Sequence, residues 1–297
     1  MKNFSYDSIG NLLTKSDVGN YAYPVPGLPR PHGVVSVDGE IVSAAFSYDA
    51  NGNQTNATGI GRSIAYNAAN KPTSIARGAL TLNFADDVDH QRYKQTLMQG
   101  ASVTTTRYLD AFGVHVELVT SATTQWNEYL MVGGSMVGVR FLQGSTVTLR
   151  YFHQDHLGSI AVITDASGLL AEARDAYDAW GKRRNPNGTD DATGSIASLT
   201  SRGFTGEEML ASVGLVHLNG RVVACPRAGA AGPGGPVHRP HDQRRSGRGR
   251  SAQRAELEPL LLRLQQPARL YRPHRLLPGV HRHRQSASRR AAASTAR

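Results

Sequence analysis

The stretch Tyr48-Asp49-Ala50-Asn51-Gly52-Asn53 decides the fold, because its spacing recurs along the chain. In such a stretch the aspartate side chain accepts hydrogen bonds from backbone N–H groups further on, and glycine supplies the positive φ that a tight loop needs. Each copy therefore predicts a hairpin loop of about three to five residues. Three further copies are residues 6–11, 66–71 and 177–182, and the Asp-x-x-Gly half alone recurs at 110–113, 155–158 and 165–168.

The segments between these loops favour short strands. Partial alternation of apolar and polar residues between frequent turn signals is typical of β-structure, and amphipathic helical periodicity is nearly absent. We therefore predict an all-β fold in which consecutive hairpins form a sheet ribbon. The predicted strands include 63–66, 80–84, 103–108, 114–119, 147–152 and 160–164. The predicted structural turn motif consists of Tyr6, Asp7, Gly10, Tyr48, Asp49, Gly52, Asp155, His156, Gly158, Asp165, Gly168, Tyr177, Asp178 and Gly181.

The tyrosine that precedes the loop in the full copies ends the incoming strand. At that position we expect its ring to stack on a side chain across the strand pair.

Charge divides the chain into two unlike parts. Residues 1–221 contain 17 Lys and Arg against 20 Asp and Glu, whereas residues 222–297 contain 16 Arg, no Lys and three acidic residues. The net charge of +10 therefore comes from the second part. The single cysteine, Cys225, also lies there, so the first part can form neither a disulfide framework nor a cysteine zinc site. No run is long enough for a membrane-spanning helix, and no apolar signal segment follows Met1.

The repeats resemble the tyrosine-aspartate (YD) repeats of Rhs, teneurin and insecticidal-toxin-complex proteins. A more specific stretch is Tyr151-Phe152-His153-Gln154-Asp155-His156-Leu157-Gly158-Ser159, which is similar to the opening of the Rhs repeat-associated core domain. Residues 162–165, 177–181, 204–208 and 214–221 continue that pattern in the same order. The resemblance extends over residues 6–221 and is weakest between 21 and 45.

The resemblance implies an organisation and a function. Members of this family build a hollow β shell around a C-terminal toxin, and the core domain closes one end of it. We therefore expect YD-repeat hairpins over 1–145, part of the core domain over 146–221 and a basic Arg/Pro/Ala-rich tail over 222–297. The expected role is non-catalytic encapsulation and presentation of a toxin, in competition between bacteria or against a host. The expected partners are the remaining shell and its toxin, in a parent protein that is secreted or on the cell surface.

The family pattern breaks after Arg221. In many members the core domain cuts off the toxin with aspartates near an Asp-Pro-x-Gly element, but this chain contains no Asp-Pro dipeptide. Codons for residues 256–277, read one base later, can encode Asn-Asn-Pro followed by Asp-Pro-x-Gly, and arginine without lysine is typical of GC-rich DNA in a wrong frame. We therefore predict a frameshift near codons 221–228 and a disordered tail without function.

The alternative for the tail is a genuine basic segment that binds phosphate groups. No groove-reading motif accompanies its charge, so we expect no specific nucleic-acid binding.

Two clusters of potential metal ligands are present. His153, Asp155 and His156 could ligate zinc or manganese, but successive strand side chains point to opposite faces, so a role in the turn is favoured. A second cluster, interpreted as a solvated loop because it lacks the EF-hand order, consists of Asp86, Asp87, Asp89 and His90. We expect no metal and no cofactor.

Catalytic signatures are absent from the sequence. It contains no Gly-x-Ser-x-Gly, His-Glu-x-x-His or phosphate loop, so we do not expect an enzyme. Trp126, Tyr129 and Trp180 leave open a second function, a repeat module that binds cell-surface glycans or a partner protein. Cross-strand packing of these aromatic residues is the competing interpretation.

Overall fold

The computed structural model describes residues 2–39, 43–111, 114–172, 174–191, 196–218 and 222–224. The chain divides into two compact units, Met1–Arg244 and Arg245–Arg297, and every described residue belongs to the first. The predicted tail, including Cys225, therefore lies outside the described residues except for 222–224.

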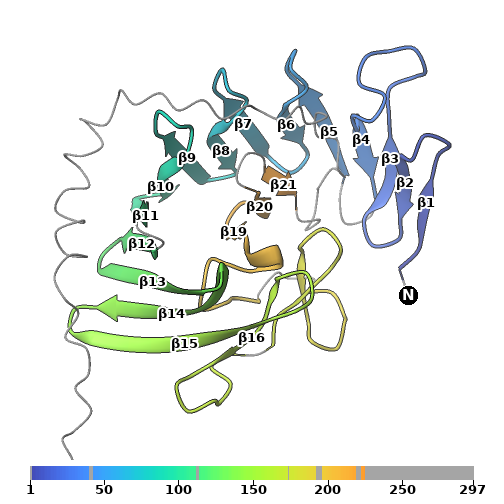
Figure 1. Cartoon of the computed structure of the whole chain (residues 1–297). Coiled ribbons are helices and arrows are strands. Elements are labelled where there is room, and N and C mark those ends of the chain that lie inside the picture. Colours follow the sequence, from blue (N-terminus) through green and yellow to red (C-terminus); the bar gives the residue numbers. More distant parts are fainter. Residues whose placement is uncertain are drawn as a thin grey trace, which may run out of the picture. The chain divides into compact units, whose positions relative to one another are not determined.

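Sixteen antiparallel strands form one sheet, and their spatial order is their order along the chain (Figure 1). The predicted all-β ribbon of hairpins is confirmed, and each of the six predicted segments lies within a strand. The strands are β1 Phe4–Tyr6, β2 Leu12–Lys15, β3 Gly19–Ala22, β4 Ser36–Asp38, β5 Ser43–Tyr48, β6 Gln54–Thr58, β7 Arg62–Tyr66, β8 Pro72–Arg77, β9 Leu80–Asp86, β10 Arg92–Gln99, β11 Ser102–Ala111, β12 Val114–Thr120, β13 Thr124–Val132, β14 Ser135–Gln143, β15 Thr146–Gln154 and β16 Ile160–Thr164.

Two small sheets follow the ribbon, in a segment that we call the crossing segment (residues 174–191, 196–218 and 222–224). The first pairs β17 Ala176–Tyr177 with β18 Arg183–Arg184, and a 3-10 turn, Phe204–Gly206, precedes the second. The second sheet contains β19 Glu208–Leu210, β20 Leu215–His217 and β21 Val222–Ala224. β21 lies beyond the boundary expected at Arg221, because its backbone extends the ladder of β20.

One face of the ribbon, which we call the inner face, packs against the crossing segment. Side chains alternate between the two faces of a strand, so directly paired residues share a face. Ile64, Ile75 and Leu82 are such a row on β7, β8 and β9. They form a buried cluster with Leu210, Val213 and Leu215 of the crossing segment. Burial of one such side chain contributes about 1.5–3 kcal/mol, so apolar packing is a major part of this attachment.

The crossing segment also contacts both ends of the ribbon. Next to β1, the rings of Phe4 and Trp180 lie 5.5 Å apart. At β16, the N–H of Ile160 donates to the carbonyl of Gly203 at 3.0 Å. The first unit is thereby held together through contacts between residues far apart in the sequence.

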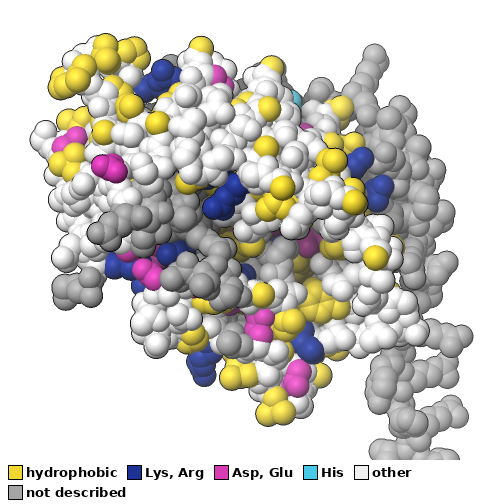
Figure 2. Space-filling view, turned by 180° about the vertical axis from the view of Figure 1, so that it is seen from behind, with side chains coloured by type: hydrophobic (Ala, Val, Ile, Leu, Met, Phe, Trp, Pro, Cys, Tyr) yellow, Lys and Arg dark blue, Asp and Glu magenta, His cyan; other side chains and the backbone are white. Residues whose placement is uncertain are grey.

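Charge is dispersed over the described surface. On the face shown in Figure 2, acidic, basic and hydrophobic side chains are interspersed. This agrees with the nearly balanced charge of residues 1–221. Within the described ranges, no helix has the length and the apolar character needed to cross a bilayer.

Candidate functional site

The turn motif forms a five-residue loop with one hydrogen-bond pattern. In the loop that starts at Asp49, its N–H donates to the carbonyl of Asn53 at 2.9 Å, and the N–H of Gly52 donates back to the Asp49 carbonyl at 3.1 Å. The Asp49 carboxylate accepts the N–H of Asn53 at 2.9 Å. The Asn53 side-chain amide and these backbone donors hold the pKa of Asp49 below its usual value. The same backbone pattern starts at Asp7, Asp155, Asp165 and Asp178, with Gly10, Gly158, Gly168 and Gly181 at positive φ.

The cluster around Asp87 is another copy of this loop. Its carboxylate accepts the N–H groups of Asp89 at 2.9 Å and Gln91 at 2.8 Å, and His90 takes the left-handed position with φ of 59°. Residues 88–90 are exposed, as predicted for a solvated loop, and the loop also has the hydrogen-bond pattern of the turn motif. His90 stands where the other copies have glycine or asparagine, so the sequence pattern does not identify this copy. Loops with the same backbone bonds also start at Asn67, Asn185 and Gly203.

Asp110, by contrast, does not start such a loop. It lies in β11 and pairs in register with His115 of β12, and the two side chains contact each other. The predicted turn at 110–113 is therefore wrong for Asp110, because the strand continues past it to Ala111. Gly113 lies outside the described residues.

The stacking expected across the strand pair is present at Tyr177, because the guanidinium of its paired residue Arg183 lies 5.6 Å from the centre of its ring. Two tyrosines of the motif also form hydrogen bonds. The hydroxyl of Tyr48 donates to the carbonyl of Val34 at 2.8 Å, and that of Tyr177 donates to the carbonyl of Ile160 at 3.3 Å. Tyr6 is 58% exposed. The half-buried tyrosines Tyr48 and Tyr177 therefore attach their loops to a neighbouring backbone.

Neighbouring loops are joined to one another by side chains. Asn11 donates through Nδ2 to the carbonyl of Pro31 at 3.0 Å, and Arg30 donates through Nη1 to the carbonyl of Asp49 at 2.7 Å. Asn53 then donates through Nδ2 to Oδ1 of Asn70 at 2.8 Å. The loops that start near residues 7, 30, 49 and 67 therefore form a connected row. Its asparagines were not among the predicted residues.

Two of the predicted metal-ligand candidates, His153 and His156, have different surroundings. His153 on β15 contacts the hydroxyl of Thr164 through Nε2 at 3.1 Å, whereas His156 is exposed in the loop. Within the described ranges, no three His, Cys, Asp or Glu side chains are grouped as metal ligands.

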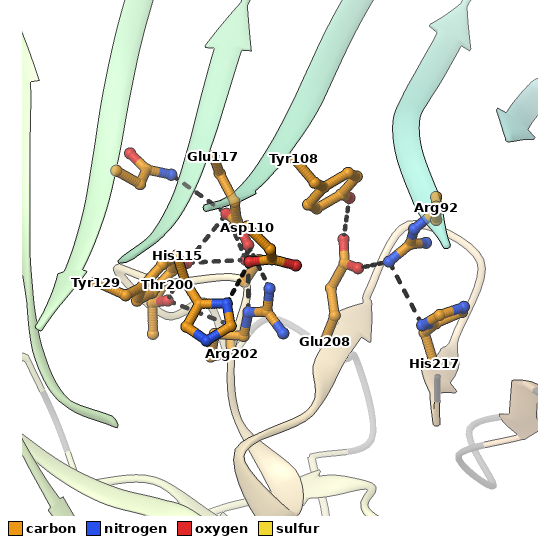
Figure 3. A network of polar contacts seen from close by, with 12 residues as sticks. Arg92, Tyr108, Asp110, His115, Glu117, Tyr129, Thr200, Arg202, Glu208 and His217 are labelled. Atoms are coloured by element: carbon orange, nitrogen blue, oxygen red, sulfur yellow. Dashed lines mark hydrogen bonds and ion pairs between the residues drawn. The ribbon is translucent and has the colours of Figure 1, made fainter. Parts of the chain in front are cut away.

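A buried polar network joins the inner face of the ribbon to the crossing segment (Figure 3). On one side, Arg92 of β10 forms an ion pair with Glu208 of β19, and the hydroxyl of Tyr108 donates to Glu208 at 2.6 Å. On the other side, Glu117 of β12 forms an ion pair with Arg202 at 3.0 Å. The pairs are crossed, since ribbon and crossing segment each contribute one carboxylate and one guanidinium.

Further side chains complete the surroundings of Glu117. It accepts hydrogen bonds from the hydroxyl of Tyr129 at 3.0 Å and from Ser201 Oγ at 3.1 Å. Only 3% of Glu117 and 4% of Glu208 is exposed. Buried charges are tolerated when they are paired and hydrogen-bonded, as these are.

Burial and charge shift the protonation of the network. Burial acts to lower the pKa of Arg202, but the nearby Glu117 outweighs it, so the pKa rises above its usual value. Burial and the adjacent Arg92 lower the pKa of His217 to about 3. Neutral His217 can accept at Nδ1, which lies 3.4 Å from Nη2 of Arg92. The imidazole of His217 is therefore uncharged at neutral pH.

The chemistry of this network suits attachment. A general acid or base must reach a proton on a substrate, whereas both glutamates here direct their oxygens to internal partners. Of the network residues, only Tyr129 was a candidate from the sequence, and it was considered there for glycan stacking. A local signal exists for Glu117, which stands between the apolar residues Val116 and Leu118.

The aromatic residues considered for glycan stacking do not form one surface. Trp126 and Tyr129 are three positions apart on β13 and so point to opposite faces of the sheet. Their exposed fractions are 5% and 3%. Tyr129 belongs to the network, and Trp180 packs on Phe4.

Two glycines of the motif allow a matched test of what the loops contribute. Gly181 has φ of 83° and Gly168 has φ of 84°, so alanine is equally strained at both, by about 1–3 kcal/mol. A Cβ on Gly181 would lie 2.8 Å from the ring of Phe204, whereas nothing lies within 4 Å at Gly168. We expect Gly181→Ala to cost about 1–3 kcal/mol more than Gly168→Ala in urea unfolding. Equal losses would contradict the packing of this loop against Phe204.

No family model and no curated protein sequence matches the chain. Among solved structures, a chain in the crystal structure of TcdB2-TccC3-Cdc42 is 15% identical with a TM-score of 0.49, over 75% of this chain and 14% of that chain. A chain of the Photorhabdus luminescens Tc holotoxin pore is 12% identical with a TM-score of 0.44, over 75% of this chain and 15% of that chain. This chain thus spans about one seventh of the length of the structures it matches.

Proposed function

We propose that this chain is a non-catalytic part of an Rhs-type shell protein that encloses and presents a toxin. The observation that supports it most is the ribbon, in which sixteen strands are paired in sequence order. Because each strand bonds only to its neighbours along the chain, such a ribbon can be lengthened hairpin by hairpin without rearranging the rest. A wall that surrounds another polypeptide needs this property.

The crossing segment supports the same proposal. It carries later motifs of the core-domain resemblance, residues 177–181 and 204–208, and it is attached to the inner face by apolar packing and crossed ion pairs. In the proposed parent, this attachment anchors the core domain inside the wall. The proposed partners are the remaining wall and the toxin, and the proposed location is outside the cell or on its surface.

Sequencing of the gene and its flanks tests the proposal. We expect further Tyr-Asp-x-x-Gly repeats upstream in the same frame, a single-base change near codons 221–228, and a toxin-coding region downstream of the restored frame. The restored frame should encode the Asp-Pro-x-Gly element that this chain lacks.

Two outcomes would count against it. A complete gene with neither repeats upstream nor a toxin downstream would remove the basis for a shell. An intact frame through codons 221–228, with the arginine-rich tail retained in closely related strains, would instead favour a selected basic segment.

A further inference from the structure

Arg62 on β7 is a buried cation whose charge is not balanced within the described part of the chain. Only 5% of the residue is exposed. Its Nη2 donates to Oε1 of Gln54 at 3.0 Å, and its Nε is buried without a hydrogen-bond partner. No ion pair among the described residues includes Arg62.

A second guanidinium lies beside it. Arg77 of β8 is directly paired with Arg62, so both side chains leave the same face of the ribbon. Arg77 extends under the crossing segment, since a Cβ on Gly214 would lie 2.8 Å from its Nη1. Burial and the charge of Arg77 lower the pKa of Arg62 to about 10, so Arg62 remains charged at neutral pH.

Arg62 differs in this respect from other buried cations of the first unit. Arg92 pairs with Glu208, and Arg202 pairs with Glu117. Two further cations are paired in the same way, Lys15 with Asp17 and Arg183 with Asp175. A buried charge without a counter-charge is strongly unfavourable, so the position of Arg62 favours an anion as its missing partner.

The surroundings suit a small anion. The arginine pair lies between two apolar clusters, one of which includes Ala57, the residue paired with Arg62, and the other Ile64 and Ile75. Apolar surroundings strengthen the attraction between unlike charges. A guanidinium presents N–H groups in a planar fork that matches the oxygens of a carboxylate or phosphate.

We propose that Arg62, with Arg77 beside it, binds a small oxyanion, either a carboxylate or a phosphate, on the inner face at β7 and β8. The proposal is independent of the shell function. It rests on the buried, unpaired Nε and on the cross-strand arginine.

Thermal and urea unfolding of the full chain test the proposal. Wild type is compared with Arg62→Met in sodium phosphate, sodium acetate and sodium chloride of equal ionic strength at pH 7. Arg107→Met on β11 is the matched control, because Arg107 points to the opposite face from Tyr108 and pairs with Leu118. At anion concentrations above the dissociation constant, each ten-fold increase in the concentration of the free anion should shift the unfolding equilibrium of wild type about ten-fold.

The variants separate site binding from general salt effects. Phosphate stabilises proteins in general by strengthening the burial of apolar surface, so wild type and both variants should gain stability in this way. Wild type and Arg107→Met should gain further stability from saturable anion binding, and Arg62→Met should lack this further gain. A response to acetate alone identifies a carboxylate site, and a response to phosphate alone identifies a phosphate site. Equal responses of wild type and Arg62→Met in both salts would overturn the proposal.

A direct measurement covers the case in which Arg62→Met does not fold. The Nε–H resonance of Arg62 in the wild-type chain should shift in a saturable manner as phosphate or acetate is added. A resonance that stays unchanged at millimolar concentrations of both anions would overturn the proposal as well.

Discussion

Glu117→Ala is expected to destabilise the first unit by about 3–5 kcal/mol, because it leaves a buried guanidinium without its counter-charge. Arg202 donates to Glu117 through Nε at 3.2 Å and through Nη2 at 3.0 Å. The substitution also removes the acceptor of the Tyr129 hydroxyl, which lies 3.0 Å away. Such a loss is a large share of the about 5–15 kcal/mol that is typical of a folded domain. Urea unfolding followed by tryptophan fluorescence measures it.

The matched control is Glu128→Ala on the neighbouring strand. Glu128 also forms an ion pair, with Arg140, but about a quarter of each side chain is exposed, at 25% and 28%. An exposed pair contributes about 0–1 kcal/mol, so this variant should remain close to wild type. Equal losses from Glu117→Ala and Glu128→Ala would contradict the role of the network.

A double variant separates the pair from its burial. Replacing both Glu117 and Arg202 with methionine removes both charges and fills similar space, so it should be markedly more stable than Glu117→Ala. Limited proteolysis gives an independent measurement, since loss of the network should expose residues 196–218 to cleavage. If the double variant is as unstable as Glu117→Ala, the unpaired charge of Arg202 is not the cause of the lost stability.

Acidification is expected to destabilise the first unit through His217. Its pKa is about 3 in the folded chain against an ordinary 6.5, because of burial and the neighbouring Arg92. Between these values the unfolded chain binds more protons than the folded chain. The contribution is therefore complete above pH 6.5 and is lost as the pH falls, by about 2 kcal/mol at pH 5 and about 4 kcal/mol at pH 3. The cations that face His217 are Arg92, Lys71 and Arg202.

Asp175 has the opposite dependence, so the total slope does not isolate His217. Burial raises the pKa of Asp175 to about 6 despite its pairing with Arg183. Its folded form binds more protons than its unfolded form, and its contribution is present at low pH and is lost as the pH rises through about 6. A comparison of variants is therefore needed.

The measurement compares wild type with His217→Gln at pH 7 and pH 5. Wild type should lose about 2 kcal/mol more than the variant between these values. His156→Gln, at an exposed histidine, is the control and should retain the wild-type dependence. If His217→Gln keeps that dependence too, His217 does not couple the crossing segment to pH.

The all-β class, the hairpin loops and the location of most strands could be predicted from the amino-acid sequence. These features depend on short-range interactions, as in the loop from Asp49 to Asn53, where five consecutive residues contain every donor, acceptor and positive φ that the turn needs. Apolar alternation was likewise sufficient to locate β7 and β12. The exceptions are local too, since His90 replaced the expected glycine and Asp110 stayed in its strand.

Tertiary structure alone decided which distant residues meet. Glu117 and Arg202 are 85 positions apart, and Tyr108 and Glu208 are 100 apart, with no local pattern to connect them. Two-residue periodicity assigns a side chain to a face but does not tell which segment covers that face. That choice depends on how the crossing segment folds back over the ribbon, where apolar burial brings its charges beside their partners. For this reason the turn residues could be named from the sequence, whereas the buried network and the Arg62 site could not.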